Sequence, residues 1–134
     1  MSVALAKTFS AADARLQSLE RGLADGTEPA LQATVAAALN VVADLLRAYI
    51  ADRAQMPATM DGDDVLELFK VFVKGDPSLN AVRDNIRELV YYRNCLDLRR
   101  EDALPAKPAH MAVRTARHIY LYLRTRCVQE RRLE

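Results

Sequence analysis

Apolar residues recur at intervals of three and four along most of this chain, which is the period of an α-helix. The pattern is most extended after Thr27, where one stripe comprises Leu31, Val35, Leu39, Val42, Leu46 and Tyr49. Alanine, leucine and arginine dominate the composition, and these residues lose little conformational freedom in a helix. No strand-like alternation persists anywhere, so we expect an all-α fold.

Five helices follow from this periodicity and from capping residues. We expect them at about 10–23 with an earlier start left open, from after 27 to about 54, at about 64–74, from 77 to about 99, and from 108 to about 131. Ser10 is predicted as the N-cap of the first helix, Pro29 as a first-turn residue of the second, and Asp76 as the N-cap of the fourth. With 134 residues, the chain is predicted to be a single domain over residues 1–134, an antiparallel helical bundle of four long helices plus one short helix.

The expected short helix at 64–74 is apolar almost all round, so it must be covered by the bundle or by a second chain. The expected helix at 27–54 is rich in alanine, which lets a neighbour approach closely. These two helices offer more apolar surface than one small bundle readily hides. The pattern therefore predicts a two-fold homodimer. Residues 56–62 are expected to form a loop because they contain Pro and Gly.

Cys95 and Cys127 fall on helical patterns without a metal-type spacing, which favours a reducing compartment over a disulfide scaffold. The N-terminal residues lack the uninterrupted apolar run of a signal peptide. The most apolar segment is interrupted by Asn40, Asp44 and Arg47, which argues against a membrane-spanning helix. We therefore expect a cytoplasmic protein that does not associate with a membrane.

Charge is distributed unevenly between the two halves of the chain. Residues 1–67 contain 5 Lys and Arg against 10 Asp and Glu, whereas residues 68–134 contain 14 against 8. This asymmetry favours an anionic ligand near the C-terminal half or head-to-tail association, although two helices with basic solvent faces would look the same.

Arg93 interrupts the apolar stripe of the expected fourth helix, which comprises Val82, Ile86, Leu89, Val90 and Leu96. A buried guanidinium is costly to desolvate unless it is paired or functional. A structural arginine would be enclosed and would pair with Asp97 one turn later, or with a carboxylate of another helix. A ligand-binding arginine would instead open on a groove.

The segment Tyr92-Arg93-Asn94-Cys95-Leu96-Asp97-Leu98, followed by a break and a proline-led final helix, resembles the end of a HEPN domain. HEPN domains are small helical bundles that commonly dimerise, and they carry an Arg-polar-x-x-x-His signature near the end of the penultimate long helix. In active members the arginine and the histidine cleave RNA in a composite site across the dimer. The resemblance extends over residues 64–130 and implies such a site at Arg93 and Asn94.

The histidine of this signature falls on Leu98, and neither Arg99 nor Arg100 replaces it. RNA cleavage to a cyclic phosphate needs a general acid or base near neutral pH, which histidine supplies and leucine cannot. We therefore expect a non-catalytic HEPN-like module that binds RNA or a protein partner through a groove around Arg93 and Asn94.

The alternative interpretation is a metal-independent, toxin-like ribonuclease in which Arg93 and Asn94 act with a histidine from elsewhere. His110 and His118 are the only histidines, and either chain of a dimer could supply one. No cysteine or carboxylate stands at ligand spacing from them, and there is no glycine-rich phosphate loop or nucleophile elbow. We expect neither a metal nor a cofactor.

The expected final helix carries a basic stripe, Arg114, Arg117, Arg124 and Arg131, interleaved with Tyr120 and Tyr122. Such stripes with aromatic side chains bind nucleic-acid backbones, but the solvated outer face of a bundle helix has the same pattern. The residues predicted to line a binding surface are Arg93, Asn94, Arg99, Arg100, Arg114, Arg117 and Arg124.

Overall fold

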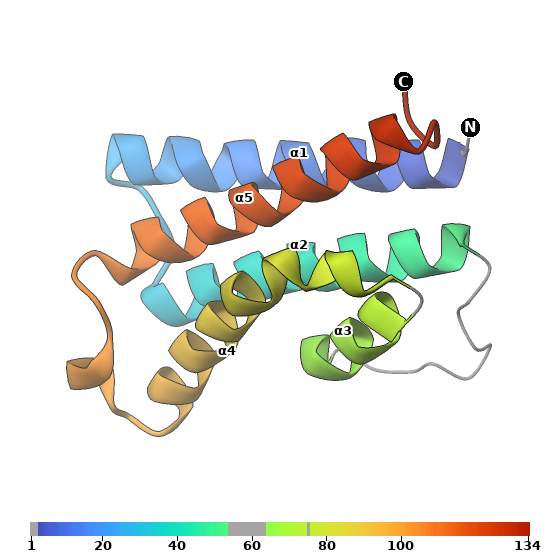
Figure 1. Cartoon of the computed structure of the whole chain (residues 1–134). Helices are drawn as coiled ribbons and strands as arrows, with labels where there is room; N and C mark the ends of the chain where they lie inside the picture. The colour runs from blue at the N-terminus through green and yellow to red at the C-terminus, as the bar shows by residue number, and fades with distance from the viewer. Residues whose placement is uncertain (1–2, 54–63, 75) are drawn as a thin grey trace.

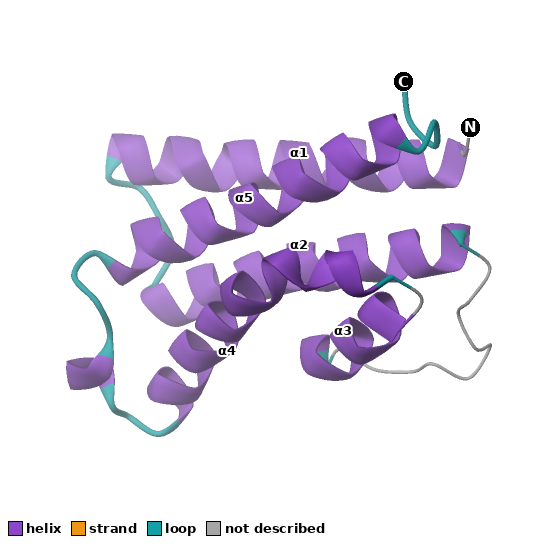
Figure 2. Cartoon of the chain, in the orientation of Figure 1, coloured by secondary structure: helices purple, strands orange, loops and turns teal. Residues whose placement is uncertain are grey.

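The computed structural model describes residues 3–53, 64–74 and 76–134, and every regular element in these ranges is helical (Figure 2). In chain order the elements are α1 (Val3–Asp25), α2 (Leu31–Asp52), α3 (Val65–Lys74), the 3₁₀ helix η1 (Pro77–Val82), α4 (Arg83–Asp97), the 3₁₀ helix η2 (Glu101–Ala103) and α5 (Pro108–Gln129). The prediction of an all-α fold is confirmed. The loop predicted at 56–62 lies outside the described residues.

Helix α2 lies at the centre of the fold, in contact with α1, α3, α4 and α5 (Figure 1). Its apolar residues cover most of its circumference, so one neighbouring helix cannot bury them all. Leu45, Leu46 and Ile50 are completely enclosed, as is Thr34, whose hydroxyl donates a hydrogen bond to the Pro29 carbonyl at 3.3 Å. Helices α1 and α5 also lie against each other, and α4 contacts both α3 and α5.

Helix α2 is long enough and apolar enough to cross a membrane, with a mean hydropathy of 1.4 over 18 consecutive residues. In this fold, 61% of that 18-residue stretch is buried by the rest of the chain. Such burial is typical of a core helix.

Helix α3 is covered within the chain, because Val65, Leu68, Phe69 and Phe72 are all buried. The ring of Phe72 meets the ring of Tyr49 of α2 edge-on, with 5.2 Å between the ring centroids. The apolar face of α3, which was one reason to predict self-association, is therefore largely buried within one chain. The homodimer stays a prediction that rests on other arguments.

Two residues predicted to start helices do not do so, Ser10 and Pro29. Helix α1 begins at Val3, and Ser10 lies exposed inside it instead of capping it. The alanines that precede Ser10 favour helix, and the apolar stripe continues back to Leu5, which is buried. Pro29 precedes α2 instead of lying in its first turn, because Ala30 is the N-cap.

The start and the end of the predicted fourth helix also differ from the structure. Asp76 is an N-cap, as predicted, and its carboxylate accepts hydrogen bonds from the Ser78 backbone N–H (3.1 Å) and hydroxyl (2.6 Å). The residues that follow form η1 before the α-helical geometry begins at Arg83. Helix α4 ends at Asp97, since Arg99 adopts a left-handed backbone conformation with a φ of 56°.

Substitution Leu46→Ala tests the central position of α2. Leu46 has no exposed surface, so we expect the free energy of unfolding to fall by about 2–5 kcal/mol, which is the usual cost of such a cavity. Leu121 of α5 is 52% exposed, and Leu121→Ala should change stability by less than about 0.5 kcal/mol. Urea unfolding followed by circular dichroism measures both. Equal losses in the two variants would contradict this fold.

Candidate functional site

A groove runs between α3 and α4, with a volume of about 330 Å³. Its floor is apolar and consists of Leu66, Phe69, Ile86, Val90 and Tyr91. Its polar lining consists of Lys70, Arg83, Arg87 and Asn94. We call these nine residues the α3–α4 groove.

The α3–α4 groove exists because the two helices are each held on α2 by their own buried faces. On α4 that face includes Ile86 and Leu89, and on α3 it includes Leu68 and Phe72, all of which have at most 1% exposed surface. The two helices also contact each other, and the groove lies between them. A side chain of the groove is thus positioned by its helix and not by a loop.

The charged groups of the α3–α4 groove are all cationic. Lys70 pairs with Glu67 one turn earlier on α3, at 3.0 Å, and Arg83 lies 3.6 Å from the carboxylate of its neighbour Asp84. Both pairs are exposed, so they are weak. Arg87 makes no hydrogen bond or ion pair with any residue of the described ranges. The groove therefore presents positive charge around an apolar floor.

Of the two residues of the HEPN-like signature, Asn94 lines the α3–α4 groove and Arg93 does not. Arg93 is half-buried on α4 and has no hydrogen bond or ion pair within the described part of the chain. The pairing with Asp97 predicted for a structural arginine is not formed. Asp97 is the exposed last residue of α4, where an ion pair gains little and costs side-chain entropy.

The other predicted binding residues do not converge on this groove. Arg99 is exposed beyond the end of α4, and Arg100 donates two hydrogen bonds to Asp102, each of 3.1 Å. Arg114 is exposed on α5 and carries no ion pair among the described residues. Arg124 lines a separate hollow of about 360 Å³, formed by both ends of the described chain together with α1 and α5.

Arg117 is engaged inside the chain. Its guanidinium donates two hydrogen bonds to the Glu20 carboxylate of α1, at 2.7 and 3.1 Å, and one to Asp13 at 2.7 Å. The hydrogen bond to Glu20 is the main cause of a raised pKa of Arg117. The guanidinium also lies over the ring of Tyr120, 5.1 Å from its centroid. Arg117 joins α5 to α1, and three of its five N–H donors are used in doing so.

Neither histidine lines the α3–α4 groove, and the depression that His118 lines does not include Arg93. His118 is exposed on α5 and lines a depression of about 310 Å³ with Leu121, Tyr122 and Arg126 among its neighbours. His110 is exposed in the first turn of α5. Within the described ranges, neither imidazole forms a hydrogen bond or an ion pair.

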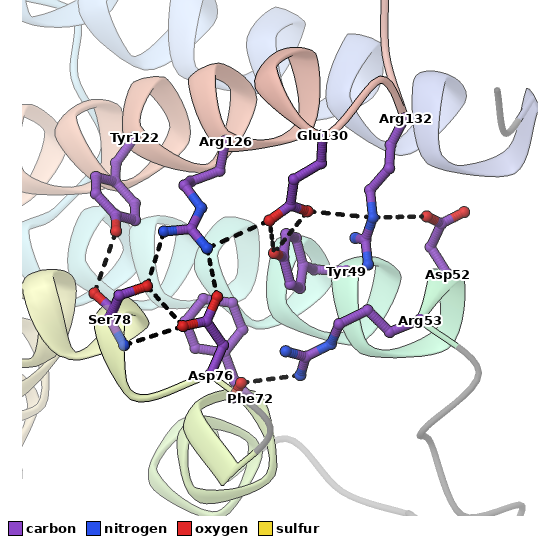
Figure 3. Close-up of polar contacts among 10 residues, drawn as sticks. All are labelled: Tyr49, Asp52, Arg53, Phe72, Asp76, Ser78, Tyr122, Arg126, Glu130 and Arg132. Atoms are coloured by element: carbon purple, nitrogen blue, oxygen red, sulfur yellow. Dashed lines mark hydrogen bonds and ion pairs between the residues drawn. The ribbon is translucent and has the colours of Figure 1, made fainter.

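A polar network that the sequence did not predict lies where the C-terminal end of α5 meets α2 and η1 (Figure 3). The Tyr49 hydroxyl donates to Glu130, with distances of 3.0 and 3.2 Å to its two oxygens. Arg126 links Glu130 (3.3 Å) to Asp76, the cap of η1. Arg132 completes the network by pairing with Glu130 at 3.3 Å and with Asp52 at 3.4 Å. We call these residues the C-terminal network.

The ring of Tyr49 lies close to two guanidiniums, that of Arg132 from the C-terminal network and that of Arg53. Arg132 lies 4.3 Å from the ring centroid and Arg53 lies 4.9 Å from it, and Arg53 also donates to the Phe72 carbonyl at 2.8 Å. Burial, reinforced by the neighbouring Glu130, raises the pKa of Tyr49 to about 12. Burial also raises the pKa of the Cys127 thiol to about 11, so this cysteine remains protonated and is a poor nucleophile.

Comparisons with protein-family models, with curated proteins and with solved structures found no match for this chain. Among residues 3–53, 64–74 and 76–134, no three His, Cys, Asp or Glu side chains gather in a way that could hold a metal ion.

Substitution Tyr49→Phe tests the buried hydroxyl through its titration. The folded chain keeps the Tyr49 proton up to a pKa of about 12, whereas an unfolded tyrosine loses it near its usual value of 10. The stability that the hydroxyl contributes is therefore present below pH 10 and is lost as the pH rises towards 12. We expect the stability difference between wild type and Tyr49→Phe to shrink by about 1 kcal/mol between pH 9 and 11. Denaturant unfolding at both pH values measures it, and parallel pH profiles would argue against a protected hydroxyl.

Substitutions Arg117→Ala and Arg114→Ala compare two arginines of the predicted basic stripe. Arg117→Ala removes three hydrogen bonds to partly exposed carboxylates, so we expect a stability loss of about 1–2 kcal/mol. Arg114→Ala should change stability by less than about 0.5 kcal/mol. Thermal and urea unfolding check both values. An Arg117→Ala variant as stable as wild type would contradict a structural role for Arg117 and would favour a solvent-facing one.

Proposed function

We propose that this chain is a non-catalytic, HEPN-like helical module that binds an anionic partner through the α3–α4 groove. The observation that carries the proposal is the composition of that groove, in which Lys70, Arg83 and Arg87 surround an apolar floor. Asn94, the polar residue of the HEPN-like signature, lies at the same groove and adds a hydrogen-bonding group. Concave sites of this kind, apolar with a few convergent polar groups, are the usual form of binding sites.

The fold proposed for this module is an antiparallel bundle of the four long helices α1, α2, α4 and α5, with α3 as the short fifth helix. The contacts of α2 with all four other helices support this arrangement. Two further properties stay predictions: a two-fold homodimer, for which the family resemblance is the remaining argument, and a cytoplasmic location. Light scattering that gives a mass of twice 15.0 kDa would support the dimer.

The ribonuclease alternative needs a histidine beside Arg93. Within the chain, His118 lines a depression whose lining does not include Arg93, so the site would depend on a second chain. General acid–base catalysis requires a group within hydrogen-bonding reach of the reacting atoms, directly or through one water. The arrangement of side chains in one chain thus supports binding better than cleavage.

A nuclease assay with Arg93→Ala and His118→Ala distinguishes the two functions. Because Arg93 makes no ion pair with a described residue, we expect Arg93→Ala to keep its stability within about 1 kcal/mol of wild type. Neither variant should change the rate at which labelled single-stranded RNA disappears, since no cleavage is expected from wild type. Cleavage by wild type that falls about 10²–10⁴-fold in either variant would establish the ribonuclease and exclude a purely binding role.

A further inference from the structure

We infer that the occupant of the α3–α4 groove is an acidic amphipathic helix contributed by a different protein. This inference rests on the proposed function, because it names the kind of partner that the same groove would bind.

The shape of the groove suits a short helix. Arg83, Arg87 and Asn94 are four and seven residues apart along α4, so they form one row on the side of that helix. At 1.5 Å per residue, the row is about 16 Å long, which equals about three turns of a second helix laid beside it. A volume of about 330 Å³ accommodates a few apolar side chains and no large ligand.

The cations of the groove are poorly neutralised by this chain. Arg87 has no partner in the described ranges, and the side chains of the Lys70–Glu67 pair are 72% and 61% exposed. The Arg83–Asp84 contact is 3.6 Å long and is also exposed. These exposed ion pairs contribute little free energy, so little is lost when carboxylates of a partner replace them. The partner's carboxylates would then add electrostatic complementarity that the free chain lacks. Acidic residues that flank the apolar positions of a helix would complement Lys70 on one side and the α4 row on the other.

The floor of the groove favours a protein over RNA. Leu66 and Val90 are aliphatic and border the groove, with the fully buried Ile86 beneath them, and they match apolar side chains spaced at three and four residues on a docked helix. Single-stranded nucleic acids bind instead through aromatic platforms on which bases stack. Tyr91 is the most exposed aromatic ring of the groove, and its hydroxyl is held by a hydrogen bond of 2.8 Å to the Ala103 carbonyl.

The described helices do not supply such an acidic helix for a second copy of this chain. The large apolar side chains that the described residues leave exposed are Val3, Tyr91, Leu98, Leu121 and Val128. Of those on helices, only Tyr91 has carboxylates at helical spacing, Glu88 and Asp84, and Tyr91 itself lines the groove, so this face of α4 is a wall of the site and not its occupant. The clearest acidic pair of α1, Asp13 and Glu20, is engaged by Arg117. The occupant that fits is a helix of another protein.

The test uses a labelled 16-residue peptide as the probe, with leucines at intervals of four and three and glutamates at most other positions. Fluorescence anisotropy measures its binding to the wild-type chain, and NMR chemical shifts locate it. Arg87→Glu should weaken binding at least about tenfold, equivalent to about 1.4 kcal/mol. The matched control is Arg114→Glu, which reverses an exposed cation on α5 and should weaken binding less than about twofold. Circular dichroism and melting curves confirm that both variants fold.

Two control ligands make the result specific. A peptide of the same composition with its leucines scrambled should bind at least about tenfold more weakly, because it has no apolar face. A 16-residue oligouridine tests the nucleic-acid occupant. Shifts at Leu66, Val90 and Asn94, with the loss in Arg87→Glu, would support the inference. Equal binding of the scrambled peptide, equal losses in Arg87→Glu and Arg114→Glu, or shifts confined to α5 would overturn it.

The same experiment separates the failure of this inference from the failure of the proposed function. If oligouridine binds at the groove in an Arg87-dependent manner while the peptide does not, the occupant is wrong and the binding groove stands. If the chain self-associates on light scattering and Arg87→Glu abolishes this, the occupant is a second copy and the inference fails. If neither probe binds and the chain cleaves RNA, the proposed function fails as well.

Discussion

Helix α2 is apolar over most of its circumference, and its burial requires the other helices to lie around it. Residues such as Leu45, Leu46 and Ile50 have no exposed surface, and each contributes about 1.5–3 kcal/mol when removed from water. Helices α1 and α5 cover part of this surface, and α3 and α4 cover another part. The α3–α4 groove is a consequence of this arrangement, because both of its walls are supported by α2.

At the C-terminal end of α2, the contacts with other elements are hydrogen bonds and ion pairs in addition to apolar packing. The C-terminal network joins α2 through Tyr49 and Asp52, α5 and the residues after it through Arg126, Glu130 and Arg132, and η1 through Asp76 (Figure 3). Asp76 has two roles, since it caps η1 and accepts the Arg126 guanidinium. The connection between α3 and α4 is thus held against α5, which helps to set how the two walls of the groove face each other.

This division of roles bears on how the groove would work. Its walls are helical and are held on a buried core, so a partner would meet a preformed surface and little ordering would be needed on the side of this chain. The least exposed ion pairs of the described residues lie outside the groove, at Arg117 and in the C-terminal network. The cations of the groove have only exposed neighbours or none. Positive charge therefore remains available there.

The sequence by itself determined the features that depend on near neighbours along the chain. The positions of α2, α3 and α5, the cap at Asp76 and the apolar character of α3 all follow from periodicity and capping, which act over a few residues. Ser10 was the exception, because a good N-cap residue does not start a helix when the residues before it also favour helix and extend the apolar stripe.

Only the tertiary structure decided which charged groups meet. Sequence reasoning offered Asp97 as one possible partner of Arg93 and placed Arg117 on a basic stripe that binds a ligand or faces solvent. The structure leaves Arg93 without an ion pair in the described ranges and binds Arg117 to Asp13 and Glu20. The carboxylates that bind Arg117 are 97 and 104 residues away from it, and Glu130, which accepts from the Tyr49 hydroxyl, is 81 residues from Tyr49. No periodic pattern encodes such distances, since they depend on how the buried stripes of different helices pack together. The same packing brings Asn94 to a groove with Lys70 of α3 and leaves Arg93 out of it.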